Sequence, residues 1–200
     1  ICARMRIPRK VVVGYWKDPE AQRRIAIFAR VSASLADARK VRCLMFGMNM
    51  NNVAVTDGDR VEFEQRLGYH VDYYPVSSLM DYWKKVTPEE TETLVEEYKK
   101  LYTIKIDETG PEVYWEKVRN AARAEIAIRR VLKDEGATAF TTNFDDLGDA
   151  DVNAPGFVGF DQIPGLACQR LMAEGVGFGA EGDWKTACLQ RTLWVMSQGL

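Results

Sequence analysis

Strand-like and helix-like segments alternate along this chain of 200 residues, and the alternation limits the folds that it can adopt. The strand-like segments are short and rich in β-branched or aromatic residues, and they span residues 10–16, 41–46, 53–56, 70–74 and 138–142. The helix-like segments carry apolar residues at helical spacing, and they span residues 19–38, 59–67, 88–102, 111–135, 166–173 and 183–197. This alternation predicts an α/β fold with a Rossmann-like, open, mainly parallel sheet flanked by helices.

Local signals place several of the helix ends. Asp18-Pro19 supplies an N-cap followed by proline at the first helical position. The sequence Thr87-Pro88-Glu89-Glu90 is a capping box. Gly68 and Gly136 are good stops at the carboxyl ends of two helices. We therefore expect these helices to begin and end close to these residues.

Composition and charge exclude several classes of protein. The net charge of −2 gives no electrostatic reason to expect nucleic acid or a membrane surface as a partner. No apolar run approaches the ~20 residues that a spanning helix needs. The four cysteines are scattered without a C-x-x-C pair, so we expect buried, reduced thiols and a cytoplasmic protein.

Residues 1–200 are expected to form a single central domain of a longer chain. The sequence begins at Ile1 rather than at methionine, and it stops just past a helix-like segment. An N-terminal and a C-terminal portion would then be absent. We expect apolar patches on the surface where those portions would dock.

The glycine-rich stretch 177–182 formally matches the dinucleotide-binding pattern G-x-G-x-x-G. That motif requires a strand immediately before it, whereas the preceding residues 171–174 look helical. Glu181 would also place a carboxylate where a pyrophosphate should approach. A nucleotide-binding oxidoreductase is therefore disfavoured.

Glu181 lies on a glycine-bracketed turn directly before a helix. A carboxylate at a helix N-terminus is stabilised by the partial positive charge there, so spacing alone favours capping by Glu181 and Asp183. Asp145-Asp146, in the loop after a strand, is another functional candidate that turn formation also explains. His70 is the only histidine and lies in a strand pattern, so neither a zinc site nor a Ser-His-Asp triad can be assembled within the chain.

Several stretches, in order along the chain, resemble the L-arabinose isomerase family. The earlier ones are Cys2–Arg6 with Val11–Trp16, Phe46–Met50 with Val53–Asp59, Phe140–Leu147, and Ile163–Ala167 with Gln169–Met172. The most specific is the last, Glu181-Gly182-Asp183-Trp184-Lys185-Thr186-Ala187.

The resemblance implies an aldose–ketose isomerase that interconverts L-arabinose and L-ribulose through a cis-enediol. Such chemistry needs a base to move a proton and a cation to polarise two oxygens. By the resemblance, Glu181 is a catalytic carboxylate and a metal ligand, and Met50 and Phe144 line the sugar pocket. The implied cofactor is Mn²⁺, which the family holds with two glutamates and two histidines.

The resemblance also implies that this chain carries only part of the reaction centre. The second glutamate and both histidines have no counterpart here, and His70 matches neither histidine. The family's active site draws residues from a neighbouring subunit, so we expect a homo-oligomer in the full-length protein and a fragment that is inactive alone. Met48, Asn52 and a longer loop at 148–162 depart from the family pattern and bear on which sugar is preferred. The alternative is a catalytically silent sugar-binding or scaffold domain of the same fold.

Overall fold

The computed structural model describes residues 1–147 and 164–199, without the side chain of Asp146. Four strands form one sheet: β1 (Arg42–Phe46), β2 (His70–Tyr74), β3 (Ala139–Thr142) and β4 (Gly177–Gly179). Their order is β2-β1-β3-β4, and every neighbouring pair is parallel. The predicted open α/β fold with a parallel sheet is therefore confirmed.

Eight α-helices and one 3₁₀ helix surround or extend this sheet in the described residues. They are α1 (Pro19–Ala38), α2 (Arg60–Leu67), α3 (Val76–Trp83), α4 (Pro88–Leu101), α5 (Pro111–Asp134), α6 (Phe144–Leu147), α7 (Gly165–Ala173), α8 (Trp184–Ser197) and the 3₁₀ helix η1 (Ala54–Thr56). The expected ends of α1, α2 and α4 are confirmed: Asp18 caps α1, Gly68 ends α2 in the left-handed conformation, and the Thr87 capping box starts α4.

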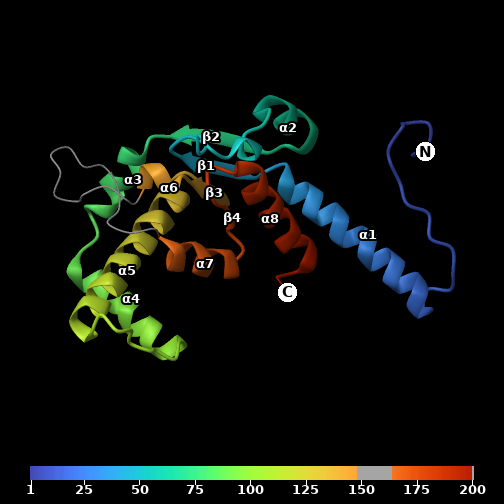
Figure 1. Ribbon diagram of the computed structural model, residues 1–200. Coiled ribbons are helices and arrows are strands. Elements are labelled where there is room, and N and C mark those ends of the chain that lie inside the picture. Colours follow the sequence, from blue (N-terminus) through green and yellow to red (C-terminus); the bar gives the residue numbers. More distant parts are fainter. Residues whose placement is uncertain (148–163, 200) are drawn as a thin grey trace.

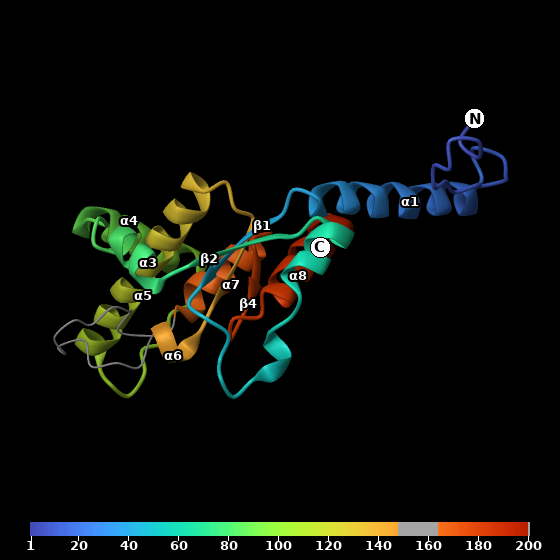
Figure 2. The same cartoon turned by 90° about the horizontal axis from the view of Figure 1, so that it is seen from above.

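The two faces of the sheet bury different helices. Leu44 and Phe46 of β1 pack into a core with α3, α5 and α7. The intervening Cys43 and Met45 point to the other face, where they pack with Trp184 of α8. This alternation follows from the two-residue period of a strand. Figures 1 and 2 show the result, with α3, α4 and α5 on one side of the sheet and α1 and α8 on the other.

Two strand predictions were wrong. Residues 10–16 are not a strand, and Val13 is 84% exposed, because the segment has no neighbouring strand in the described structure to pair with. Residues 54–56 form the 3₁₀ helix η1 instead, since the backbone N–H and the hydroxyl of Thr56 both donate to the Val53 carbonyl. Helix α3 was missed, although Val76, Leu79 and Met80 are buried at helical spacing.

Helix α1 extends away from the sheet and carries residues 1–17 at its far end (Figures 1 and 2). Its carboxyl end is attached to α8, where Arg191 forms an ion pair with Asp37 and Ser34 donates to the Thr192 carbonyl. Along the rest of the helix, four apolar side chains at helical spacing are between 43% and 54% exposed: Ile25, Phe28, Val31 and Leu35. An apolar patch of the kind expected from the sequence therefore lies on α1.

A buried carboxylate joins α4, α5 and α7 on the opposite side. Glu125 of α5 is fully buried and accepts hydrogen bonds from Tyr98 of α4 at 2.7 Å and from Arg170 of α7 at 2.9 Å. Arg129, one turn along α5, donates to both Glu125 and Glu174. The charge-assisted bonds compensate for burying these groups, so the network fixes how the three helices pack.

Helix α8 lies too close to β4 for a side chain at position 177 or 179 of the strand. A Cβ at Gly179 would overlap with the Asp183 carbonyl oxygen, and one at Gly177 would overlap with the Ala187 carbonyl oxygen. Only glycine can occupy these two positions without moving the first turns of the helix.

We expect Gly179→Ala to lower the stability of the full-length protein by about 1–3 kcal/mol, the usual effect of overpacking. The matched control is Gly165→Ala, because Gly165 lies in α7 and no atom of the described residues is within 4 Å of its Cβ position. That control should leave stability unchanged or raise it slightly, since alanine favours helix. Thermal unfolding of both variants checks this, and equal melting temperatures would contradict the proposed close packing.

Candidate active site

The candidate site lies at the carboxyl edge of the sheet, where β1, β3 and β4 end side by side. Phe46 of β1 is in register with Thr142 of β3, and Thr141 with Gly179 of β4. The chain passes from β1 outwards to β2 and then returns to β3 on the other side of β1. Ligands of open α/β sheets bind outside the carboxyl ends of the strands at such a reversal point.

Each of the three residues singled out by the resemblance follows a different one of these strands. Met50 follows β1, Phe144 begins α6 directly after β3, and Glu181 follows β4; all three are half-buried. The backbone N–H of Met50 donates to the Glu181 carbonyl at 3.2 Å, and the N–H of Gly182 donates to the carbonyl of Thr142 at 3.0 Å. The fold thus brings the loop after β4 into direct contact with β3 and with the loop after β1.

Glu181 adopts a backbone conformation that is unfavourable for any residue with a Cβ. Its φ angle is +63°, and that of the following Gly182 is +81°. A Cβ at Gly182 would lie 2.6 Å from the Cα of Asn49, so glycine is required there. Left-handed backbone costs a non-glycine residue roughly 1–2 kcal/mol, and strain of this kind collects at functional sites.

Capping of α8 is the task of Asp183 rather than of Glu181. The Asp183 carboxylate accepts hydrogen bonds from the backbone N–H of Thr186 at 3.0 Å and from its hydroxyl at 2.7 Å. The Glu181 carboxylate makes no hydrogen bond or ion pair with any residue of the described ranges. Within the described residues, the Glu181 carboxylate therefore does not hold this turn together.

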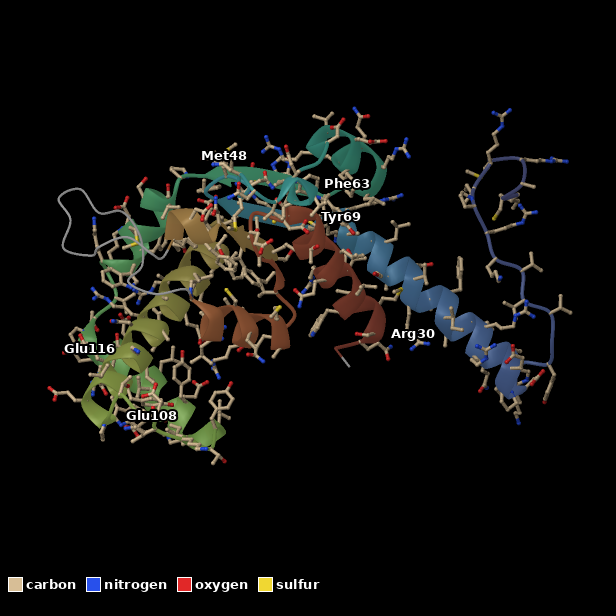
Figure 3. All side chains as sticks on the ribbon, viewed as in Figure 1. Arg30, Met48, Phe63, Tyr69, Glu108 and Glu116 are labelled. Atoms are coloured by element: carbon tan, nitrogen blue, oxygen red, sulfur yellow. The ribbon has the colours of Figure 1, made fainter. Side chains whose placement is uncertain are left out.

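The loop after β1 is held against the Glu181 turn and α8 by two side chains that the sequence alone did not single out. Asn49 Nδ2 donates to the Gly182 carbonyl at 2.9 Å and to the Thr56 hydroxyl at 3.2 Å. Lys185 Nζ donates to two backbone carbonyls of the same loop, at Val55 and Asp57. Figure 3 shows Met48, which is 59% exposed, at the start of this loop.

The dinucleotide interpretation fails on the structure. The segment before Gly177 is helix α7, and Gly177 and Gly179 themselves belong to β4. Their missing side chains make room for α8 rather than for a pyrophosphate.

His70 lies at the opposite edge of the sheet, because it is the first residue of β2. Its two ring nitrogens are within 3.0 Å of Glu64 and Asp72 carboxylate oxygens. The hydrogen bond with Glu64, helped by the charge of Asp72, raises the pKa of His70 above its ordinary value against a smaller effect of burial. His70 is thus a paired surface residue of the sheet, as the sequence indicated.

Within residues 1–147 and 164–199, no three His, Cys, Asp or Glu side chains come together in a way that could hold a metal ion. Asp145 is exposed, and its backbone N–H donates to the side chain of Asn143, which is a turn interaction. The Asp146 side chain and the loop 148–162 lie outside the described residues. The Glu181 carboxylate is a group of the kind that a hard divalent cation binds, and any further ligands would have to come from outside the described residues.

Other findings bear on the class of protein. Cys43, Cys168 and Cys188 are buried free thiols, as expected, whereas Cys2 is exposed. No helix in the part of the chain that the structure describes has the length and apolar character needed to cross a bilayer.

Comparison with known families matches nearly the whole chain. Residues 42–199 match the central domain of L-arabinose isomerase, and residues 1–40 match its N-terminal domain. The chain belongs to the L-arabinose isomerase family. The family boundary falls at the end of α1, so this helix is counted with the N-terminal domain and the sheet with the central one.

Similar members of the L-arabinose isomerase family come from several bacteria. The chain is 58% identical over 202 residues to the L-arabinose isomerase of Phocaeicola vulgatus and 57% identical over 202 residues to that of Bacteroides thetaiotaomicron. The Thermotoga neapolitana enzyme is 46% identical over 200 residues. Each match covers 100% of this chain but 38% of the relative. The chain therefore spans well under half the length of these relatives.

The pairing of His70 predicts a pH dependence of stability. Because the pKa of His70 is raised in the folded state, protonated His70 stabilises the fold at pH values below its unfolded-state pKa of 6.5. This stabilisation is lost as the pH rises through the folded-state pKa. His70→Gln should therefore flatten the decline in melting temperature that begins as the pH rises past about 6.5. Glu64→Gln, which removes the main cause of the shift, should flatten it as well. Parallel curves for the parent and His70→Gln would contradict this.

The backbone of Glu181 predicts an unusual order of stability. Glu181→Gly and Glu181→Ala both remove the carboxylate, but only glycine relieves the left-handed strain, so the glycine variant should be more stable by about 0.5–1 kcal/mol. At the exposed position Glu116 of α5 (Figure 3), the order should reverse, because glycine is the poorer helix former by about 1 kcal/mol. Thermal unfolding of the four variants measures both differences, and an alanine preference at residue 181 would show that this turn is unstrained.

Proposed function

We propose that the full-length protein is an aldose–ketose isomerase that converts L-arabinose to L-ribulose, and that Glu181 is its catalytic carboxylate from this chain. The observation that carries the proposal is the position of Glu181 in a chain of this family. The residue occupies a strained turn at the carboxyl edge of the sheet, in contact with the loop of Met50 and without a partner in the described residues.

The reaction moves one proton between adjacent carbons of the sugar and a second proton between their oxygens, through a cis-enediol. The residues of this chain act on the transfer between the carbons, and the transfer between the oxygens would fall to groups beyond this chain. The Glu181 carboxylate, which no cation of the described residues neutralises, takes the proton from one carbon and returns it to the next. Met50, on the loop after β1, and Phe144, at the start of α6, supply apolar walls that orient the sugar and exclude water. Mn²⁺, with Glu181 as one ligand, would polarise the two oxygens of the reacting carbons.

The rest of the reaction centre would come from beyond this chain. The described residues offer one suitable carboxylate and no cluster of metal ligands. The relatives are much longer than the chain, which spans 38% of each. We propose that the remaining ligands belong to the other portions of the full-length protein and to a neighbouring subunit of a homo-oligomer. The fragment alone would then be inactive.

We expect Glu181→Gln to lower the kcat of the full-length protein for Mn²⁺-dependent conversion of L-arabinose by at least ~100-fold, the usual contribution of a general acid–base group. The change keeps the shape of the side chain and removes its charge, and the melting temperature should change little. Glu116→Gln, the same substitution at an exposed site on α5, is the control and should retain full activity.

Two results would contradict the proposal in different ways. An active Glu181→Gln variant would show that Glu181 only shapes the turn. A parent protein that does not convert L-arabinose would overturn the substrate assignment and favour a catalytically silent sugar-binding or scaffold domain.

A further inference from the structure

We propose that Asn49 is a positioning residue for the Glu181 carboxylate, and through it for the metal ion; this inference rests on the proposed function. Asn49 acts on the backbone of the turn rather than on the carboxylate itself. It lies in the loop after β1, 132 positions before Glu181 in the sequence, and meets the turn because β1 and β4 end at the same edge of the sheet.

The hydrogen bonds around Asn49 fix the orientation of its amide. The carbonyl of Gly182 can only accept a hydrogen bond, so the atom that faces it at 2.9 Å must be Nδ2. The hydroxyl of Thr56 donates to the Val53 carbonyl at 2.8 Å, and its oxygen therefore accepts the second Nδ2–H, at 3.2 Å. Thr56 is buried. Each of the two amide protons of Asn49 therefore has its own acceptor, and only one orientation of the amide satisfies both.

The turn needs such support because its conformation is unfavourable on its own. Strained left-handed residues persist only where the surrounding structure determines them. Three backbone hydrogen bonds hold Glu181 and Gly182. The Glu181 carbonyl accepts from the Met50 N–H, and the Gly182 carbonyl accepts from the Trp184 N–H. The Gly182 N–H donates to the Thr142 carbonyl. Within the described residues, Asn49 supplies the one side-chain hydrogen bond to these two residues.

Asn49 also links the loop that carries Met50 to the turn that carries Glu181. Its neighbour Met50 donates to the Glu181 carbonyl, so the Asn49 amide and the Met50 backbone hold adjacent carbonyls of the same turn. Loss of the amide leaves the Gly182 carbonyl with the Trp184 N–H as its partner, and the Met50 N–H as the remaining hydrogen bond from this loop to the two residues of the turn. The direction of the Glu181 carboxylate relative to the Met50 side chain then becomes variable. Outer partners that orient a metal ligand typically contribute 10–100-fold to metal affinity or activity.

The experiment measures Mn²⁺ binding to the metal-free full-length protein by calorimetry, together with kcat and KM for L-arabinose. Asn49→Ala removes both hydrogen bonds, and Asn49→Asp keeps the size while replacing the donor by an acceptor. Asn51→Ala and Asn51→Asp make the same changes at an exposed position of the same loop and control for the new charge.

We expect both Asn49 variants to bind Mn²⁺ about tenfold more weakly and to lose about tenfold or more in kcat, with KM within about twofold of the parent. The Asn51 variants should match the parent. A merely structural role would lower the melting temperature and the active fraction but leave the Mn²⁺ affinity of the folded protein unchanged. Should Asn49→Ala not fold, the isosteric Asn49→Asp gives the same measurement.

The outcomes separate this inference from the function on which it rests. An active, Mn²⁺-binding parent whose Asn49 variants bind Mn²⁺ as the parent does would overturn the positioning role alone. A parent that neither isomerises L-arabinose nor binds Mn²⁺ would overturn the proposed function, and the positioning role with it.

Discussion

The close approach of α8 to β4 is the constraint on which the rest of the site depends. Because Gly177 and Gly179 have no side chains, the carbonyls of the first helical turns lie directly against the strand. The chain must then leave β4 and enter α8 within four residues, 180–183. These four residues form a tight turn in which the Asp183 N–H donates to the Ala180 carbonyl. Its two central residues, Glu181 and Gly182, both lie in the left-handed region.

Most residues of the block Glu181–Ala187 therefore have structural roles around the Glu181 carboxylate. Asp183 caps the helix. Trp184 is fully buried and packs edge-on against Phe63 of α2, and Figure 3 shows Phe63 and Tyr69 together beside this helix. Lys185 binds two carbonyls of the loop after β1. Asp183, Trp184 and Lys185 each hold a neighbouring element in place. The Glu181 side chain, in contrast, makes no hydrogen bond or ion pair within the described residues.

The sequence predicted those features whose causes are local. Caps and stops at Asp18, Gly68 and Thr87 act within one turn of helix, so the helix ends could be placed. The segment 10–16 has the composition of a strand, but a strand also requires a partner, and pairing is decided by the tertiary structure. The role of Asn49 was hidden for the same reason, because its contact joins two loops that only the sheet brings together. The position of Glu181 came from a resemblance, whereas its strained backbone required the structure.

The open sheet described above has two edges, and both resist the addition of a strand from another molecule. β4 is three residues long, and the backbone N–H of its central residue Phe178 donates to the side chain of Gln190 in α8 at 2.6 Å, which leaves little backbone for pairing. β2 is five residues long and carries the charged groups of His70 and Asp72 with their partners Glu64 and Arg42. Short, covered or charged edges are how natural sheets avoid aggregation through their exposed backbone. The ion pairs of His70 and Asp72 therefore also protect this edge of the sheet against self-association.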